Sequence, residues 1–396
     1  MHIQPDVVNP FNPDQPARGA DLVGRAQEIQ TIVEHLLKGE HVWIDGECGL
    51  GVTSLALEAA SRLGAQTRTI ALNLARPPRP DAAMDAVRQQ GTGASPQDPT
   101  AKGFTRVVSD LVKPGPGGDA AGAGELLSGV LRVLEQLQAR PAESRLVVVL
   151  EGLEKGRVLG AEAMGSALER MLAVRQPIVC ILCTQGGLSA EQSHTLGAAT
   201  ERVRLGPVDS RAMADWIDER LARSGVPSHG AGESIVRLAG EKTRDRVDLA
   251  SRTFDVAVKA GLANAATVEF AFKRVVNESA GKSEKTWKEL TPEERGVLQA
   301  IAEGKGLAAS SGRLPAQSSQ PDAAKLKAAV EGLLAKGVIS RETQGSLKID
   351  SPALRGWVLK ARLGLRRESV GRNRNLGFSF DLGLERKPGA SRQQVI

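Results

Sequence analysis

The sequence predicts an α/β protein: a doubly wound parallel sheet with a phosphate-binding loop, followed by a helical lid and a winged-helix domain. Apolar stretches alternate with amphipathic ones in the first half of the chain, which is typical of a parallel sheet with helices on its faces. A glycine-rich loop stands between one apolar stretch and a helix-forming segment. Near the end, amphipathic segments precede a hairpin pattern, as in a winged helix.

The glycine-rich loop, Gly46 to Ser54, follows the apolar run 41–45 and leads into the helix-forming segment 55–60. Glycines here permit positive φ angles, which turn successive N–H groups toward an anion, and the following helix directs its N-terminal dipole to the same place. The hydroxyl of Thr53 is a candidate ligand for Mg²⁺. The candidate nucleotide-binding residues of the loop are Gly46, Gly49, Gly51, Val52, Thr53 and Ser54.

One residue departs from the G-x-x-x-x-G-K-[ST] pattern of phosphate loops, because position 52 is valine instead of lysine. The absent ammonium would contact the β- and γ-phosphates. One charge-assisted contact contributes about 1.5–3 kcal/mol, so the affinity should be lower by roughly one to two orders of magnitude. No other Lys or Arg lies between Lys38 and Arg62. Two interpretations stay open: a weakened nucleotide site, or a glycine-rich turn that binds nothing.

The composition is that of a globular protein with two or three domains: 396 residues, 41% of them hydrophobic and 25% charged. No apolar run approaches the roughly 18 residues of a transmembrane helix, so we expect no membrane partner. The first residues lack the basic and apolar regions of a signal peptide. We therefore expect a cytoplasmic protein.

The three cysteines are Cys48, Cys180 and Cys183, and the last two have the C-x-x-C spacing of redox and metal sites. Both lie in the apolar run 177–183, which is typical of a buried strand. Residues three apart on a strand face opposite sides of the sheet. We therefore expect ordinary core cysteines at these two positions.

The elements of the α/β domain, residues 21–207, follow from apolar periodicity. Residues 1–20 are rich in Pro, Asn and Asp and are predicted to form an extended lead-in. Further helices are expected at 26–37, 81–90, 103–111, 125–138 and 163–173, and further strands at 67–74, 145–151, 177–183 and 202–205.

Polar residues at two strand ends complete the candidate site. The strand 145–151 ends in Glu151, where phosphate-loop proteins carry the acid that reaches Mg²⁺. Because Gly152 follows, one acid is missing whether Glu151 is the magnesium ligand or the catalytic acid. The alternative is an acid that merely faces a loop. After the strand 177–183, Thr184 or Gln185 is the candidate sensor of a γ-phosphate.

Residues 208–280 are predicted to be wholly helical, with segments at 211–224, 232–239, 246–260 and 266–278, and to form a lid. Arg244 and Arg246 are the candidate phosphate contacts of this lid. An ordinary surface position is the alternative for either arginine.

Residues 281–360 are predicted to form the winged-helix domain. One helix should begin after Thr291, an N-cap residue followed by proline, and a second should span 321–335 before a hairpin at 337–349. A winged helix that only packs against protein is an equal alternative to one that binds DNA. The candidate nucleic-acid contacts are Lys325, Lys327, Arg341 and Lys348.

Positive charge is concentrated in this last part of the chain. Residues 281–396 carry 21 Lys and Arg against 12 Asp and Glu. Nucleic acid is therefore the first candidate for an acidic partner. Residues 361–396 are predicted to be a basic, flexible tail, and a solvated surface with such a tail is the alternative explanation of the charge.

Taken in order, these motifs resemble prokaryotic AAA/STAND-type P-loop ATPases, and their layout is similar to that of archaeal origin-recognition initiator ATPases. The resemblance implies that Val23, Gly24 and Arg25 help to seat an adenine and that the loop and the strand-end acid hold Mg-ATP. It covers about residues 7–360 and rests on these stretches: Asn9-Pro10-Phe11, Val23-Gly24-Arg25 with Glu28, Gly46 to Leu55, the strand that ends at Glu151, Leu205-x-Pro207, and Asp350 to Trp357.

The sequence departs from this family at Val52, at Glu151-Gly152 and at 240–243, where a G-x-P-like lid contact is expected. We therefore expect a regulatory or adaptor pseudo-ATPase with a protein partner, in which binding of ATP or ADP with Mg²⁺ is weak or lost. One alternative is an ATP-dependent switch whose missing groups come from a neighbouring subunit or the lid. The other is a DNA-binding module positioned by an inert P-loop body.

Overall fold

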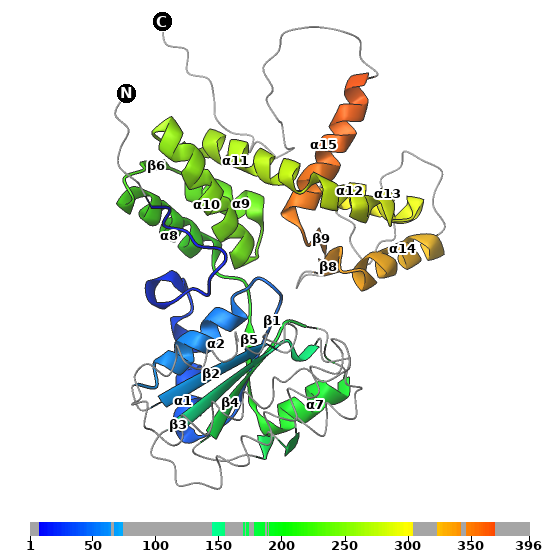
Figure 1. Ribbon diagram of the computed structural model, residues 1–396. Helices are drawn as coiled ribbons and strands as arrows, with labels where there is room; N and C mark the ends of the chain where they lie inside the picture. Colours follow the sequence, from blue (N-terminus) through cyan, green and yellow to red (C-terminus); the bar gives the residue numbers. More distant parts are fainter. Residues whose placement is uncertain are drawn as a thin grey trace, which may run out of the picture. The chain divides into compact units, whose positions relative to one another are not determined.

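The computed structural model of the chain forms two compact units, Met1–Val268 and Glu269–Ile396 (Figure 1). It describes residues 8–64, 67–73, 145–154, 169–170, 172–173, 178–186, 188, 190–303, 323–341 and 346–368. The helices expected at 81–90, 103–111 and 125–138, most of the one at 163–173, and the tail from 369 onward lie outside these residues.

The first unit is built around a five-stranded sheet with the order β2-β3-β4-β1-β5. Every adjacent pair is parallel, which confirms the predicted parallel sheet. Because β1 lies between β4 and β5, the strand order reverses beside it, and ligands bind at such a switch point in open α/β sheets. The strands are β1 (Val42–Gly46), β2 (Thr67–Asn73), β3 (Arg145–Glu151), β4 (Ile178–Thr184) and β5 (Glu201–Leu205).

Helices α1 (Ala26–Lys38) and α2 (Val52–Ser61) pack together on one face of this sheet (Figure 1). Their apolar side chains form one buried cluster with alternate strand residues, and Ile32, Leu55 and Ile181 in this cluster are fully buried. Helix α7 (Ala190–Ala199) was not predicted. Its sequence has a single large apolar residue, Leu196, so it shows no helical periodicity although that leucine is buried.

Both cysteines of the C-x-x-C spacing are buried in β4, as expected from the apolar run. Cys183 belongs to the cluster with α1 and α2, whereas Cys180, three residues earlier, does not. Burial raises the pKa of the Cys180 thiol to about 12. This thiol is therefore protonated at neutral pH and unreactive as a nucleophile.

A helical segment follows the sheet: α8 (Ser210–Arg223), α9 (Ala231–Ala239), α10 (Thr243–Ala260) and α11 (Ala265–Glu278). The prediction of a wholly helical region is wrong at two points, where β6 (Ser228–His229) and β7 (Ala263–Asn264) pair in parallel. Strands of two residues are too short to show alternation. Helix α9 packs closely on α8, because Gly232 has no side chain at the contact. An ideal Cβ there would lie 2.2 Å from the Ala214 carbonyl oxygen, which is too close.

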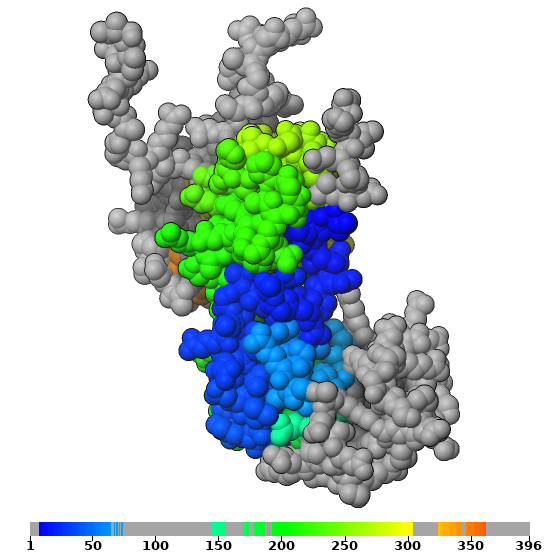
Figure 2. All heavy atoms as spheres, turned by 90° about the vertical axis from the view of Figure 1, so that its left-hand side faces the viewer, coloured from blue at the N-terminus to red at the C-terminus, as the bar shows by residue number. Residues whose placement is uncertain are grey.

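The described N-terminal residues connect this helical segment to α2. The Asn9 side-chain amide donates to α10 at 3.0 Å, and Phe11 packs edge-on against Trp216 of α8 with ring centroids 5.7 Å apart. Further along, the Ala17 N–H donates to the Ser54 hydroxyl at 3.0 Å. Figure 2 shows these dark-blue residues lying against the green helical segment and the lighter blue of α2. The described residues of the predicted lead-in therefore contact both the helical segment and α2.

The second unit contains the later part of α11 and a small helical domain with a hairpin. The predicted helices after Thr291 and within 321–335 and the two hairpin strands are present, whereas α12 was not predicted and α15 continues beyond residue 361. No helix among the described residues is long and apolar enough to cross a bilayer. The elements are α12 (Ala280–Lys288), α13 (Pro292–Ala302), α14 (Ala323–Ala335), the antiparallel strands β8 (Ile339–Arg341) and β9 (Leu347–Ile349), and α15 (Pro352–Glu368).

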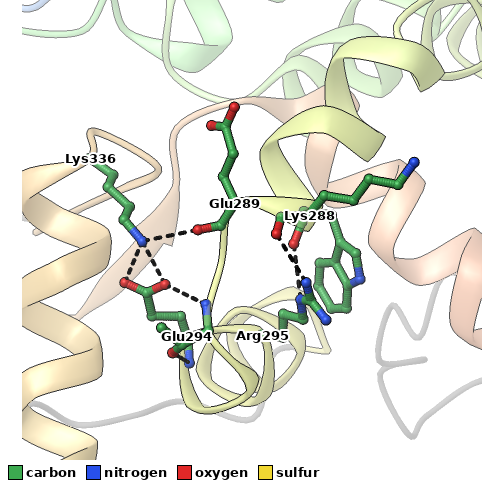
Figure 3. A network of polar contacts seen from close by, with 7 residues as sticks. Lys288, Glu289, Glu294, Arg295 and Lys336 are labelled. Atoms are coloured by element: carbon green, nitrogen blue, oxygen red, sulfur yellow. Dashed lines mark hydrogen bonds and ion pairs between the residues drawn. The ribbon is translucent and has the colours of Figure 1, made fainter.

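An ion pair between the buried carboxylate of Glu294 and the exposed Lys336 joins the start of α13 to the residue that follows α14 (Figure 3). Thr291 and Glu294 form a capping box, and the Lys336 ammonium reaches both Glu294 carboxylate oxygens at 2.7 and 2.8 Å. The helices can approach because Gly332 lacks a side chain: an ideal Cβ there would lie 2.5 Å from Glu294 Oε1. Burial raises the pKa of Glu294, but the hydrogen bonds from Lys336 and the Thr291 N–H outweigh it, so the pKa lies below its ordinary value.

We expect Lys336→Met to lower the free energy of unfolding at pH 7 by about 1.5–3 kcal/mol, because it leaves a buried carboxylate without its cationic donor. The Glu294 pKa is lowered in the folded state, so the contribution of this pair is present above pH 4.5 and is lost as pH falls through the folded-state pKa. Urea unfolding from pH 7 to pH 3 measures both effects. Lys327→Met is the control, because Lys327 is exposed and 4.0 Å from Glu331. Equal stability of the two variants at pH 7 would contradict the assignment.

Candidate functional site

The glycine-rich loop connects the carboxyl end of β1 directly to the N-terminus of α2, as predicted. Gly49 and Gly51 have φ angles of 91° and 95°, which other residues rarely adopt. Gly51 is the N-cap of α2, and the Leu50 N–H closes a turn onto the Glu47 carbonyl oxygen at 3.2 Å. The first N–H groups of a helix have no acceptor within the helix. The loop thus ends on a helix N-terminus suited to an anion.

Val52, the residue in place of the expected lysine, is 3% exposed and belongs to the hydrophobic core. An ideal Cβ on Gly46 would lie 3.1 Å from Val52 Cγ2 and 2.9 Å from Leu205 Cβ. Gly46 is therefore required for close packing of β1 against α2 and β5. The Val52 side chain therefore stabilises the loop by packing in the core, and it has no polar group that could bind a phosphate.

Thr53 and Glu151, the predicted magnesium ligands, lie together at the carboxyl ends of the strands. The Thr53 side chain hydrogen-bonds the Glu151 carboxylate, and the Asn73 amide donates to Glu151 Oε2 at 3.3 Å. Burial raises the pKa of Glu151, the hydrogen bond from Thr53 lowers it, and the charge of Glu154 raises it again. The net shift is upward. A hydroxyl beside a carboxylate is the oxygen-ligand pair that Mg²⁺ prefers.

Asn73 and Glu154 lie near Glu151, although neither is a predicted site residue. Asn73 ends β2 and pairs in register with Glu151, so a polar residue at the end of this strand was the available signal. Glu154 accepts a hydrogen bond from the Gln185 N–H at 3.4 Å, so its carboxylate connects the chain after β3 to the end of β4. A second acid is thus present near the site, three residues after Glu151.

Thr184, the predicted γ-phosphate sensor, is fully buried and already hydrogen-bonded. It accepts from the Trp43 indole N–H at 2.8 Å, and its own hydroxyl donates to Asp45 Oδ1 at 3.1 Å. Asp45 also pairs with Arg202, whose guanidinium lies 4.0 Å from the centre of the Trp43 ring. A hydroxyl has a single proton to donate, so Thr184 would have to release Asp45 before it could contact a phosphate.

The segment expected to seat an adenine is held by Arg25, which is 5% exposed. Its guanidinium donates to Glu28 at 2.9 Å and to the Gly206 carbonyl oxygen at 2.6 Å, where β5 passes into α8. Val23 is partly buried, and Gly24 has a φ angle of 66° with Val208 close by. These contacts place the segment beside the start of the helical segment. Its role toward adenine stays a prediction.

Arg246, a predicted phosphate contact, is 2% exposed and makes three hydrogen bonds within the chain. It donates from Nε to Gly240 O at 2.6 Å, from Nη1 to Val208 O at 3.0 Å and from Nη2 to Ser210 Oγ at 3.2 Å. Burial lowers the pKa of this guanidinium. The geometry assigns Arg246 to the joint between α10 and the start of α8, and a phosphate contact would require those bonds to break.

The start of α10 touches the glycine-rich loop. The main-chain N–H of Arg244 donates to the Gly49 carbonyl oxygen at 2.9 Å. The hydroxyl of Thr243, the first residue of α10, is buried and has no hydrogen-bond partner among the described residues. A buried hydroxyl without a partner is costly, so this position favours a polar ligand or water.

These residues fit the phosphates of a nucleotide and its magnesium ion, except at position 52. Thr53 and Glu151 would hold Mg²⁺, and the loop N–H groups would bind the phosphates. An ideal Cβ on Gly51 would meet nothing within 4 Å, so there is space over the loop at that residue. A bound ATP or ADP would supply the polyanion that this helix N-terminus attracts.

The predicted nucleic-acid contacts lie in the second unit. Lys325 and Lys327 are exposed on α14, and Arg341 is exposed at the end of β8. Lys348 of β9 is half-buried and makes an interaction of its own. Three of the four predicted cations are therefore available at the surface of the unit.

No protein-family model and no curated protein matches the chain. A Walker-type ATPase of Pyrococcus abyssi matches it in structure with a TM-score of 0.56 and 14% identity, over 88% of this chain and 99% of that one. Aeropyrum pernix Orc1 in complex with DNA matches with a TM-score of 0.46 and 14% identity, over 88% and 95%. The Thermotoga maritima RuvB Holliday junction branch migration motor matches with a TM-score of 0.42 and 19% identity, over 90% and 99%.

The likeness to the Pyrococcus abyssi protein shows that this chain has the P-loop α/β fold of Walker-type ATPases. This agrees with the strand–loop–helix arrangement of β1 and α2 and with the parallel sheet. The fold by itself carries no activity, so function has to be argued from the site.

We expect Glu151→Gln to raise the free energy of unfolding at pH 8 by about 0.5–1 kcal/mol, because it removes a buried charge while keeping a polar group for Thr53. The Glu151 pKa is raised in the folded state, so the contribution of Glu151 to stability is most favourable below pH 4.5 and falls as pH rises through the folded-state pKa. Urea unfolding between pH 4 and pH 8 measures the difference. Glu154→Gln should weaken the same pH dependence. A Glu151→Gln variant less stable than the wild type at pH 8 would refute the assignment.

Proposed function

We propose that this protein is a nucleotide-responsive regulator of the AAA/STAND type, a pseudo-ATPase that binds Mg-ATP or Mg-ADP weakly and hydrolyses ATP negligibly. One contrast carries the proposal: Val52 is buried in the core, whereas its neighbour Thr53 remains paired with Glu151. The candidate magnesium ligands are therefore present, whereas the loop lysine that would bind the phosphates is absent. Such a site favours binding over catalysis, because transition-state charge on the γ-phosphate lacks its usual loop cation.

In this proposal α8, α9 and α10 act as a lid, and the position of this lid depends on whether a nucleotide is bound to the loop. Support comes from the hydrogen bond between the Arg244 N–H and the Gly49 carbonyl oxygen. The N-terminal residues add a second connection, since they bind both α10 and Ser54 of α2. A conformational change of the loop would therefore move the helices through two sets of contacts. A protein partner would bind differently to the two arrangements.

A second candidate function is DNA binding through the second unit, as a winged helix. The observation that favours it is the exposed set of cations on α14 and β8 together with the net positive charge of residues 281–396. The helices α13 and α14 followed by the antiparallel β8–β9 pair support the winged-helix interpretation. In this case the P-loop unit would only position the DNA-binding one.

For the regulator, we expect calorimetric titration to give weak ATP and ADP binding that Mg²⁺ strengthens, and steady-state turnover far below the typical order of 1 s⁻¹. Thr53→Val should remove the magnesium-dependent part of the affinity, because it deletes one candidate ligand and keeps the volume. Thr31→Val, on the exposed side of α1, is the control. Rapid turnover that Thr53→Val abolishes would identify a working ATPase and reject the proposal.

For DNA binding, we expect weak affinity without strong sequence preference that falls steeply with salt. Each phosphate contact contributes about −0.9 to the slope of log K against log salt, so Lys325→Ala with Lys327→Ala should reduce the slope by about 1.8. Lys282→Ala with Lys285→Ala removes the same charge from exposed positions of α12 and is the matched control. Equal losses in both variants would mean that net charge, and not a defined surface, attracts the DNA.

A further inference from the structure

A lysine outside the glycine-rich loop lies against it. Lys242 directly precedes α10, and an ideal Cβ on Gly49 would lie 3.4 Å from Lys242 Cβ and 3.6 Å from Lys242 Cδ. Two carbons of the stem are thus at similar distances from one point of the loop. The aliphatic stem therefore runs alongside Gly49 instead of pointing away from it.

The main chain holds this lysine in place. Two residues later, the Arg244 N–H donates to the Gly49 carbonyl oxygen at 2.9 Å, and the Arg244 Cβ is 3.7 Å from the ideal Gly49 Cβ. The Arg246 N–H bonds the Lys242 carbonyl oxygen at 3.1 Å, which joins Lys242 to the first turn of α10. The stem of Lys242 is consequently held beside the loop whenever this helix start is docked on it.

Among the described residues, the other cations considered for this place have different surroundings. The loop itself has none between Lys38 and Arg62. The Arg246 guanidinium is buried and has three acceptors of its own. The Arg244 side chain is exposed, although its main chain is at the loop.

Lys242 is also available for an anion. It makes no ion pair within the part of the chain that the structure describes. Burial raises the pKa of the nearby Asp245 carboxyl, and the charge of Lys242 offsets part of this rise. Its neighbour Thr243 carries the buried hydroxyl without a partner. A polar ligand between the loop and the start of α10 would satisfy both residues.

We propose that Lys242 supplies the phosphate-binding ammonium that position 52 lacks, so that the nucleotide phosphates are bound jointly by the glycine-rich loop and the start of α10. This inference rests on the proposed nucleotide binding. It adds a means of regulation, because a loop lysine stays in the site at all times, whereas Lys242 is present only when α10 is docked. Phosphate binding and docking of α10 then favour each other by the same factor.

Calorimetric titration of the full chain with Mg-ADP and Mg-ATP tests the inference. Lys242→Met should weaken both affinities about 10- to 100-fold, since one charge-assisted contact is lost, and Lys242→Arg should keep most of the affinity. Lys259→Met is the matched control, because Lys259 is exposed in the last turn of α10. Inorganic tripolyphosphate, as a competitor, should show the same loss in Lys242→Met, which separates a phosphate contact from a base contact.

Hydrogen exchange gives a readout that does not depend on affinity alone. At saturating Mg-ADP, exchange in the first turn of α10 should slow in the wild type and change less in Lys242→Met. Unaltered ADP and tripolyphosphate affinity in Lys242→Met would overturn the role of this lysine and leave the proposed nucleotide site standing. Absence of any nucleotide binding by the wild type would overturn both. A thermal midpoint for Lys242→Met close to that of the wild type shows that folding is not the cause of a loss.

Discussion

The site depends on how the first turn of α2 is anchored. Val52 packs into the core beside Gly46 and Leu205, so apolar contacts anchor the end of the loop to the sheet. Burial of a valine side chain contributes about 1.5–3 kcal/mol. A charge-assisted phosphate contact contributes a similar amount. Valine at this position therefore strengthens the fold by about as much as it weakens a phosphate site.

One hydrogen bond connects this loop to the helices that follow the sheet, and two others join the segments around it. Arg25 bonds the carbonyl oxygen of Gly206, Arg246 bonds that of Val208, and the Arg244 N–H bonds that of Gly49. The N-terminal residues cross the same region from α10 to α2. Because Gly49, Gly206 and Val208 all follow the carboxyl ends of β1 and β5, a ligand there would act on the arrangement of loop and helices together. This is the physical basis for a regulator whose chemistry is reduced.

Much of the fold could be predicted from the sequence, because long runs of β-branched residues and regular apolar spacing identify buried strands and helices. Three kinds of element could not. The helix that buries Leu196 has too few apolar residues to show a period, the two-residue strands β6 and β7 are too short, and the charged α12 buries only Ser283 among its described side chains. For the candidate site, Thr53 and Glu151 could be selected from the sequence because one stands at the start of a helix and the other at the end of a strand.

The sequence by itself determined the parallel sheet, the glycine-rich loop, the absence of a lysine at position 52 and the acid at the end of β3, since each depends on local pattern. The tertiary structure decided what these residues do. It placed Val52 in the core, engaged Thr184 and Arg246 in hydrogen bonds, and brought Lys242 to Gly49. Side-chain direction and contacts between distant segments follow from packing over the whole chain, and spacing along the sequence does not contain them.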